Sequence, residues 1–193
     1  TTALRGLTVV NRDTVSVGAG AALTLVKSAS YANPIVPGQS RIDFVVSGTN
    51  IGAQDARPAS TAAPGGTPVL VNGAPTALVL VRDLVPAGTQ YLAGTLQTTA
   101  ANAVRLYRMP GDAPFSYRTV DDASAVEVAI GIQAPVARNA SVAMQVAVEV
   151  NADQGGEIRN TAQGHYDDGS TPAMAVSNTV LIGSGQARIG VAT

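Results

Sequence analysis

The chain has 193 residues, which is the size of one ordinary domain. It is 46% hydrophobic but only 4% aromatic, so its core must consist mainly of valine, alanine, leucine and isoleucine. The net charge of −1 provides no broad positive field, so nucleic acid is not an expected partner. The absence of cysteine excludes disulfides and thiolate metal sites. No apolar stretch approaches the roughly 20 residues that a membrane-spanning helix needs.

The apolar residues alternate with a period of two, and glycine, proline, asparagine and aspartate separate the runs. No helix start signal is followed by a convincing apolar stripe. Many short strands with regular turns are typical of an all-β sandwich or barrel. In chain order, we expect strands near residues 4–11, 14–18, 22–28, 41–47, 68–71, 77–84, 89–93, 103–107, 126–132, 141–150, 157–166, 173–182 and 186–192.

Two turns and one long loop separate the expected strands. Asn72-Gly73 is a strong signal for a hairpin between two strands. A second turn is expected within 166–170, where two aspartates precede glycine and serine. Residues 49–67 are rich in alanine, proline, glycine and serine, so we expect a loop or insertion there rather than a domain boundary.

Lys27 is the only lysine, and the alternation directs it inward. It shares a strand face with Leu23 and Leu25, where a charged group is costly unless it is paired or neutralised. Near the other end of the chain, Asn178 shares a face with Val176 and Val180. An inward lysine on an early strand and an inward asparagine on a late strand could form a covalent cross-link.

An isopeptide bond of this kind needs a neutral amine, a carboxamide and a neighbouring acid that shuttles protons. Asp83 is the best candidate acid, because it follows Val79 and Val81 on one strand face, whereas Glu127 and Glu149 fall on polar faces. The alternative is that Lys27 extends to water from a strand end and that Asn178 satisfies backbone groups.

Other polar residues give weaker signals. The pairs Asp121-Asp122 and Asp167-Asp168 could bind calcium, but acidic pairs beside glycine and serine are ordinary in turns. His165 is the only histidine and has no serine or cysteine partner, so we expect a packing or surface role. No catalytic residue, metal site or cofactor motif is therefore predicted, and the chain is not expected to be an enzyme.

Strand-like extensions flank the expected sandwich at 21–182. Residues 1–20 contain an apolar, strand-prone segment with Leu4, Leu7, Val9 and Val10, followed by the hinge Gly18-Ala19-Gly20. Residues 183–193 form a second strand-like tail after another glycine hinge. Such strands either complete their own sheet or add to the sheet of a neighbour. Head-to-tail addition between copies would produce an open homopolymer.

From Leu23 onward, several segments occur in the order found in a known family. They are LTLVKSAS at 23–30, VPGQ at 36–39, IDFVVSGTNIG at 42–52, VLVRDLVPAGTQYLAG at 79–94, GEIRNTAQGHY at 156–166 and VSNTVLI at 176–182. In these segments the chain resembles the conserved-repeat domains of large prokaryotic surface proteins. The resemblance implies an immunoglobulin-like β-sandwich outside the cytoplasm, with Lys27 and Asn178 placed for an intramolecular isopeptide bond.

We therefore expect an extracellular or cell-surface structural subunit of a prokaryote, which forms a filament or surface layer by β-strand addition between copies. The alternative is a monomeric adhesin or stalk module that binds a ligand through loops such as 49–67. Neither hypothesis requires a cofactor, nucleic acid or a membrane span.

Overall fold

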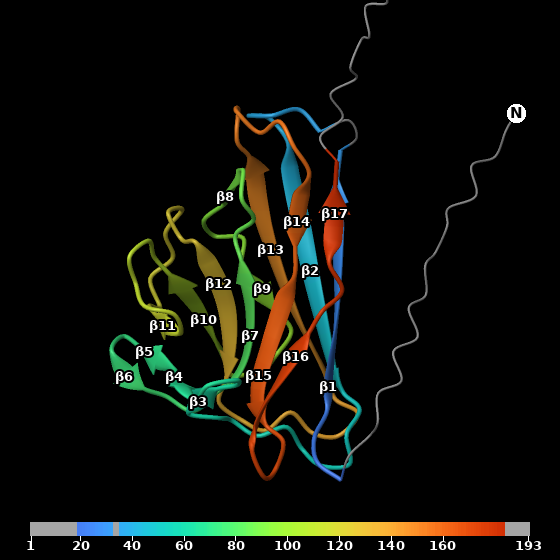
Figure 1. Ribbon diagram of the computed structural model, residues 1–193, viewed down its shortest axis with the longest axis vertical. Coiled ribbons are helices and arrows are strands. Elements are labelled where there is room, and N and C mark those ends of the chain that lie inside the picture. The colour runs from blue at the N-terminus through green and yellow to red at the C-terminus, as the bar shows by residue number, and fades with distance from the viewer. Residues whose placement is uncertain (1–18, 33–34, 184–193) are drawn as a thin grey trace, which may run out of the picture.

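The structure is a computed structural model that describes residues 19–32 and 35–183, and these residues contain strands and no helix (Figure 1). The predicted strands at 4–11, 14–18 and 186–192 lie outside the described residues, and so do Leu4, Leu7, Val9 and Val10. Within the described part, the expected all-β sandwich is confirmed: two antiparallel sheets pack face to face.

The first sheet contains the longest strands of the molecule. Its order is β1-β2-β13-β8, with β9 also paired to β13, and its strands are β1 (Leu23–Tyr31), β2 (Arg41–Asn50), β13 (Ser141–Val150), β8 (Thr89–Tyr91) and β9 (Gln97–Thr98). Alternate residues of β1, β2 and β13 are buried, as expected for strands with one face on a core. Phe44, Val46, Met144 and Val146 from this face form much of the main core.

The second sheet has the order β10-β12-β7-β15-β16. Its strands are β10 (Ala103–Arg108), β12 (Glu127–Ile132), β7 (Val79–Leu84), β15 (Ala162–Asp167) and β16 (Pro172–Val176). Every residue of β12 is buried, so this sheet is covered on both faces. Val79, Val81, Val128 and Ile130 face the main core between the sheets.

Small β-elements cover the outer face of the second sheet (Figure 1). They are the sheet β11-β5-β6 and the hairpin β3-β4, built from β11 (Ser116–Tyr117), β5 (Leu70–Val71), β6 (Ala74–Pro75), β3 (Thr61–Ala62) and β4 (Thr67–Pro68). Leu78, Leu80 and Leu106 of the larger sheet pack against Val69 and Tyr117 in a second, smaller core. The second sheet is therefore the middle layer of the molecule.

The last strands contain a bulge that changes which residues face inward. β14 (Ile158–Asn160) continues almost directly into β15, and its partner β17 (Val180–Ile182) follows β16. Gln163 pairs with Val176 and Asn160 pairs with Val180, so one strand holds one more residue than the other between these pairs. The extra residue lies within 177–179, and it reverses the alternation of buried side chains beyond that point.

The two predicted turns are confirmed. Asn72 and Gly73 connect β5 to β6 with φ values of 50° and 81°, the left-handed conformation that a two-residue hairpin requires. Asp167 to Thr171 close the turn between β15 and β16, where the Asp168 carboxylate accepts hydrogen bonds from the backbone of Ser170 and Thr171.

The loop or insertion expected at 49–67 is present, with no strand at 51–60, but it is packed against the sandwich. Ala56, Ala59 and Ala62 are buried, and the chain here makes backbone bridges to Val136, Asp167 and Leu78. The small alanine side chains allow this segment to lie close against the strand ends and the second core. Composition predicted the loop but not its packing, because these pairings are with residues distant in the sequence.

Replacement of Gly52 by alanine should destabilise the protein. A Cβ atom at this position would lie 2.5 Å from the carbonyl oxygen of Gly20 and closer still to the backbone nitrogen of Ala22. Both contacts are with backbone, which cannot rotate away, so we expect a loss of about 1–3 kcal/mol. Thermal unfolding should show a Tm lowered by roughly 2–4 °C per kcal/mol.

Gly155→Ala is the matched control, because a Cβ atom added there would have nothing within 4 Å and the backbone has no positive φ. An unchanged Tm for Gly52→Ala would contradict the close approach of residues 20–22 to residue 52.

Candidate functional site

The Lys27 side chain lies between the two sheets, and the predicted inward orientation is confirmed. Its exposed fraction is 0%, and it extends from the inner face of β1, which also carries Leu23 and Leu25. The Nζ atom lies 4.8 Å from the centre of the Phe44 ring on the neighbouring strand β2. The first sheet thus places a cation inside the main core.

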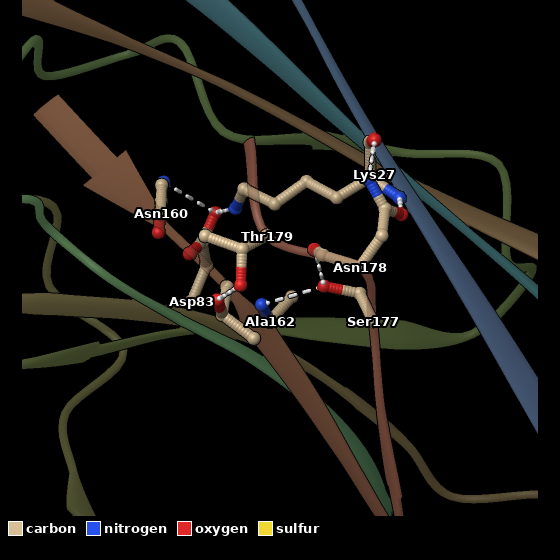
Figure 2. Close-up of polar contacts among 8 residues, drawn as sticks. Lys27, Asp83, Asn160, Ala162, Ser177, Asn178 and Thr179 are labelled. Carbon is tan, nitrogen blue, oxygen red and sulfur yellow. Dashed lines mark hydrogen bonds and ion pairs between the residues drawn. The ribbon is translucent and has the colours of Figure 1, made fainter. Parts of the chain in front are cut away.

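Asp83 of β7 supplies the counter-charge from the opposite sheet (Figure 2). Its Oδ2 atom forms an ion pair and hydrogen bond with Lys27 Nζ, and the carboxyl group is 2% exposed. The second carboxyl oxygen, Oδ1, is buried and has no hydrogen-bond partner among the described residues. Lys27 and Asp83, two of the residues predicted for a cross-link, are therefore in direct contact.

A third member of the cluster is Asn160, which the sequence analysis did not select. It lies on β14 beside β7, is 5% exposed, and its Nδ2 atom donates to Asp83 Oδ2 over 3.4 Å (Figure 2). A signal was available in the sequence. Asn160 stands two residues from each of the buried residues Ile158 and Ala162 and shares their face, just as Lys27 shares a face with Leu23 and Leu25. We define Lys27, Asp83 and Asn160 as the inter-sheet cluster.

Asn178 does not face inward, so this expectation is wrong. Its amide hydrogen-bonds to the backbone of Lys27, with Lys27 N donating to Oδ1 over 2.8 Å and Nδ2 donating to the Lys27 carbonyl over 2.9 Å. The reason is the direction of its face: Asn178 shares a face with Val176, as expected, but Val176 is 51% exposed and the buried face carries Ala175 and Ser177. Asn178 is therefore exposed beside the edge of β1. Asn178 thus satisfies backbone groups, which was the alternative considered above.

Burial dominates the electrostatics of the inter-sheet cluster. It lowers the pKa of the Lys27 amine and raises the pKa of the Asp83 carboxyl, while the attraction between the two groups opposes both changes. Both directions favour the neutral forms of the pair. Val128, Val146 and Val148 line the hollow around Asp83 and Asn160 and provide no competing polar atom.

This arrangement contains the three groups that amide exchange requires: an amine biased toward its neutral form, a carboxyl group in contact with it, and a carboxamide bonded to the same carboxyl oxygen. No group of three or more metal-ligating side chains occurs in the described residues. The carboxylates of the first acidic pair bind backbone instead: Asp121 accepts a hydrogen bond from the distant Gly94 N, and Asp122 accepts one from Ser124 N within its own turn.

A second buried charge lies on the outer face of the second sheet, contrary to the expectation that Glu127 is on a polar face. Glu127 is 1% exposed and binds Arg82 at 3.2 Å, Arg108 at 2.9 Å and the Tyr117 hydroxyl. Alternation correctly directs Glu127 away from the main core. The small sheet β11-β5-β6 then covers that face, which no local pattern indicated.

His165 has the packing role expected for it. It is 2% exposed, and its ring makes an edge contact with Phe115, at 5.0 Å between ring centres. Burial, with a further contribution from the nearby Arg82 cation, lowers the pKa of His165 to about 4. The Arg82 guanidinium also lies over the Phe115 ring, 4.5 Å from its centre.

Comparisons with known proteins give matches in three-dimensional structure only. No family model and no curated protein sequence matches the chain. Solved structures with a similar arrangement include the major pilin subunit BcpA of Bacillus cereus, which is 13% identical, with 83% of this chain and 39% of that chain covered and a TM-score of 0.49.

Two further structures are the full-length major pilin SpaD of Corynebacterium diphtheriae and the collagen-binding domain of a Staphylococcus aureus adhesin. The first is 9% identical, covers 82% of this chain and 35% of that chain, and has a TM-score of 0.48. The second is 10% identical, covers 80% of this chain and 96% of that chain, and has a TM-score of 0.40. The chain thus spans less than half the length of the two pilin subunits.

No helix capable of crossing a membrane occurs among residues 19–32 and 35–183.

The buried imidazole predicts a pH-dependent stability. His165 is neutral in the folded state down to about pH 4, whereas an unfolded chain binds the proton near pH 6.5. Stability is therefore present above pH 6.5 and is lost as the pH falls toward 4, because the unfolded state then binds more protons. Between pH 7 and 5 we expect a loss of about 2 kcal/mol from this group.

Urea unfolding of the wild type and of His165→Leu at pH 7 and pH 5 measures this effect. The variant lacks the only imidazole, so its stability should change less over this interval. Equal changes in the two proteins would show that burial does not keep His165 neutral.

Proposed function

We propose that this chain is a structural subunit of an extracellular filament or surface layer of a prokaryote, and that copies assemble by β-strand addition. The observation that carries the proposal is the inter-sheet cluster. It joins β1 of the first sheet to β7 of the second and to β14, which continues into β15, and it places reactive groups in buried positions. Such a cluster suits a protein that must resist unfolding rather than process a substrate.

We further propose that Lys27 and Asn160 form an intramolecular isopeptide bond. The neutral Lys27 amine attacks Cγ of Asn160. Asp83, in its protonated form, donates its proton to the amide nitrogen that leaves and takes up the proton that the amine loses, so Asp83 is regenerated and ammonia departs. One C–N bond forms and one breaks, so the exchange needs no oxidant or other co-reactant. Asn160 replaces Asn178 as acceptor because it shares Asp83 with Lys27.

This bond would make the sandwich resistant to tension. β1 is the first described strand, and β14 is near the end of the chain, so the bond would connect the two sheets close to where each terminus leaves the domain. A force applied through both termini would then act on a covalent link before it separated the core. Burial of the cluster within valines and Phe44 would also protect the amide from hydrolysis.

Assembly by strand addition is supported by the chain outside the described residues. The segment Leu4–Asn11 carries apolar side chains and contains no proline, so it is suited to pair with a sheet edge. Burial of a large aliphatic side chain is worth roughly 1.5–3 kcal/mol, so Leu7 and Val9 together with a backbone ladder would hold two copies together.

The mass of the intact protein tests the isopeptide bond. The wild type should be lighter than its sequence mass by one ammonia. Lys27→Met and Asn160→Ala should have their full sequence masses and lower Tm values, because the cross-link cannot form.

Asn178→Ala is the matched control. It removes the hydrogen bonds to the Lys27 backbone but should leave the ammonia loss in place. A full sequence mass for the wild type would refute the bond, and a full mass for Asn178→Ala alone would return the acceptor role to Asn178.

Deletion of residues 1–17 tests the assembly. We expect the truncated form to fold, because the deleted residues precede β1, and to remain monomeric in sedimentation velocity and negative-stain microscopy. The full chain should form fibres under the same conditions. Fibres of the same kind from the truncated form would make residues 186–192 the donor. Single particles from the full chain would favour the adhesin alternative.

A further inference from the structure

The two lateral sides of the sandwich are closed to different extents. On one side, β16 and β17 lie beside β1, and the Asn178 amide bonds to the β1 backbone (Figure 1). On the other side, the sheets end in β9 and β10, which do not pair with each other. A side-chain hydrogen bond of 3.1 Å from Arg105 to Gln97 spans this side.

Part of the β10 backbone has no strand partner in the described residues. Backbone groups alternate along a strand, and those of Val104, Leu106 and Arg108 are directed to β12, as the bond from Val126 N to the Arg108 carbonyl shows. The outward groups of Tyr107 bond to Arg118 at 2.9 and 2.8 Å. The outward N–H and C=O groups of Ala103 and Arg105 remain free to pair with another strand.

A groove lies along this free edge, with a volume of ≈ 530 Å³. Thr98 and Ala100 line it from the β9 side, Ala103 and Arg105 from β10, and Thr119 and Asp121 from the loop opposite. It combines unpaired backbone, small side chains and one carboxylate. These are the features that accept an extended peptide: a ladder edge, room for alternate side chains and a charge that sets orientation.

We propose that this groove binds the segment Leu4–Val10 of a second copy of the chain as an added strand on β10. The inference rests on assembly by strand addition, as proposed above, and identifies the acceptor edge. Eighteen residues precede the first described residue, and seven extended residues span about 23 Å, enough to cover the edge and leave a linker. The groove has two charged side chains, Asp121 and Arg105, and Arg105 is hydrogen-bonded to Gln97. Arg5 is the single charge in the segment and is opposite in sign to Asp121.

The variant Arg105→Pro tests the edge in the full chain. Proline removes the outward N–H and is tolerated on an edge strand where that group faces solvent, so the fold should persist. The added strand would lose its hydrogen bond and meet the proline ring, and the concentration needed for assembly should rise by about tenfold or more. Arg105→Ala is the matched control for loss of the side chain alone: it keeps the backbone N–H, so it should weaken assembly much less than Arg105→Pro does.

Disulfide trapping provides a second measurement that does not depend on the proline variant folding. The chain has no cysteine, so single cysteines report only on the chosen sites. Mixed Thr8→Cys and Thr119→Cys chains should form a disulfide-linked dimer upon oxidation. Thr8→Cys mixed with Ser30→Cys, on the exposed end of β1 at the opposite side, should not.

The outcomes separate this inference from the proposed function. Fibres that form without the Thr8–Thr119 link and are unaffected by Arg105→Pro would overturn the β10 acceptor but retain the polymer. A link formed within one chain of a Thr8→Cys/Thr119→Cys double variant would show self-completion and overturn the second copy as occupant. A wild type that never assembles would overturn both.

Discussion

The constraint on which this fold depends is the burial of one lysine amine between two sheets. Lys27 is 0% exposed, so its amine must be paired or lose its charge within the core, and its partner Asp83 comes from the opposite sheet. Removing one partner of a buried pair commonly costs 3–5 kcal/mol, because it leaves the other charge uncompensated. The contact between Lys27 and Asp83 therefore fixes how β1 and β7 face each other across the main core.

A second set of buried charged groups fixes the packing of layers on the other face of β7. Glu127 forms an ion pair with Arg82 and accepts hydrogen bonds from Arg108 and Tyr117, which joins β7, β10 and β12 to the small sheet that covers them. With only 4% aromatic residues, the chain has few large side chains to define its packing. Polar networks with fixed geometry then determine the layer arrangement that large aromatic contacts define in other sandwiches.

The alternation of residue types predicted the site where strands are regular and failed where they are not. Lys27 and Asp83 belong to uninterrupted strands, so their inward orientation follows from their neighbours. Asn178 shares the face of Val176, an apolar residue that is 51% exposed, and the extra residue within 177–179 separates this face from that of the buried Ile182. Asn160 stands on a strand of three residues, whose face is evident only once Ile158 and Ala162 are known to be buried.

The covering of the second sheet could not be predicted from local pattern either. It depends on β3 to β6 and on β11, which come from two parts of the chain separated by β7 to β10. Composition predicted a loop at 49–67. It did not predict that Ala56, Ala59 and Ala62 would be buried or that the segment would pair with distant residues. Pairings of this kind carry no periodic signal within the segment itself.

The adjacent positions of Arg82 and Asp83 have a consequence for the alignment of β7. Arg82 faces the outer core and Glu127, whereas Asp83 faces the main core and Lys27. If β7 paired one residue out of step, each side chain would point to the opposite face. A slip in one direction would place Arg82 opposite Lys27, and a slip in the other direction would place Asp83 opposite Glu127, both in buried sites. Either misaligned sheet would lose both native ion pairs and gain one repulsive contact, so the order of these two neighbouring charges disfavours both misalignments.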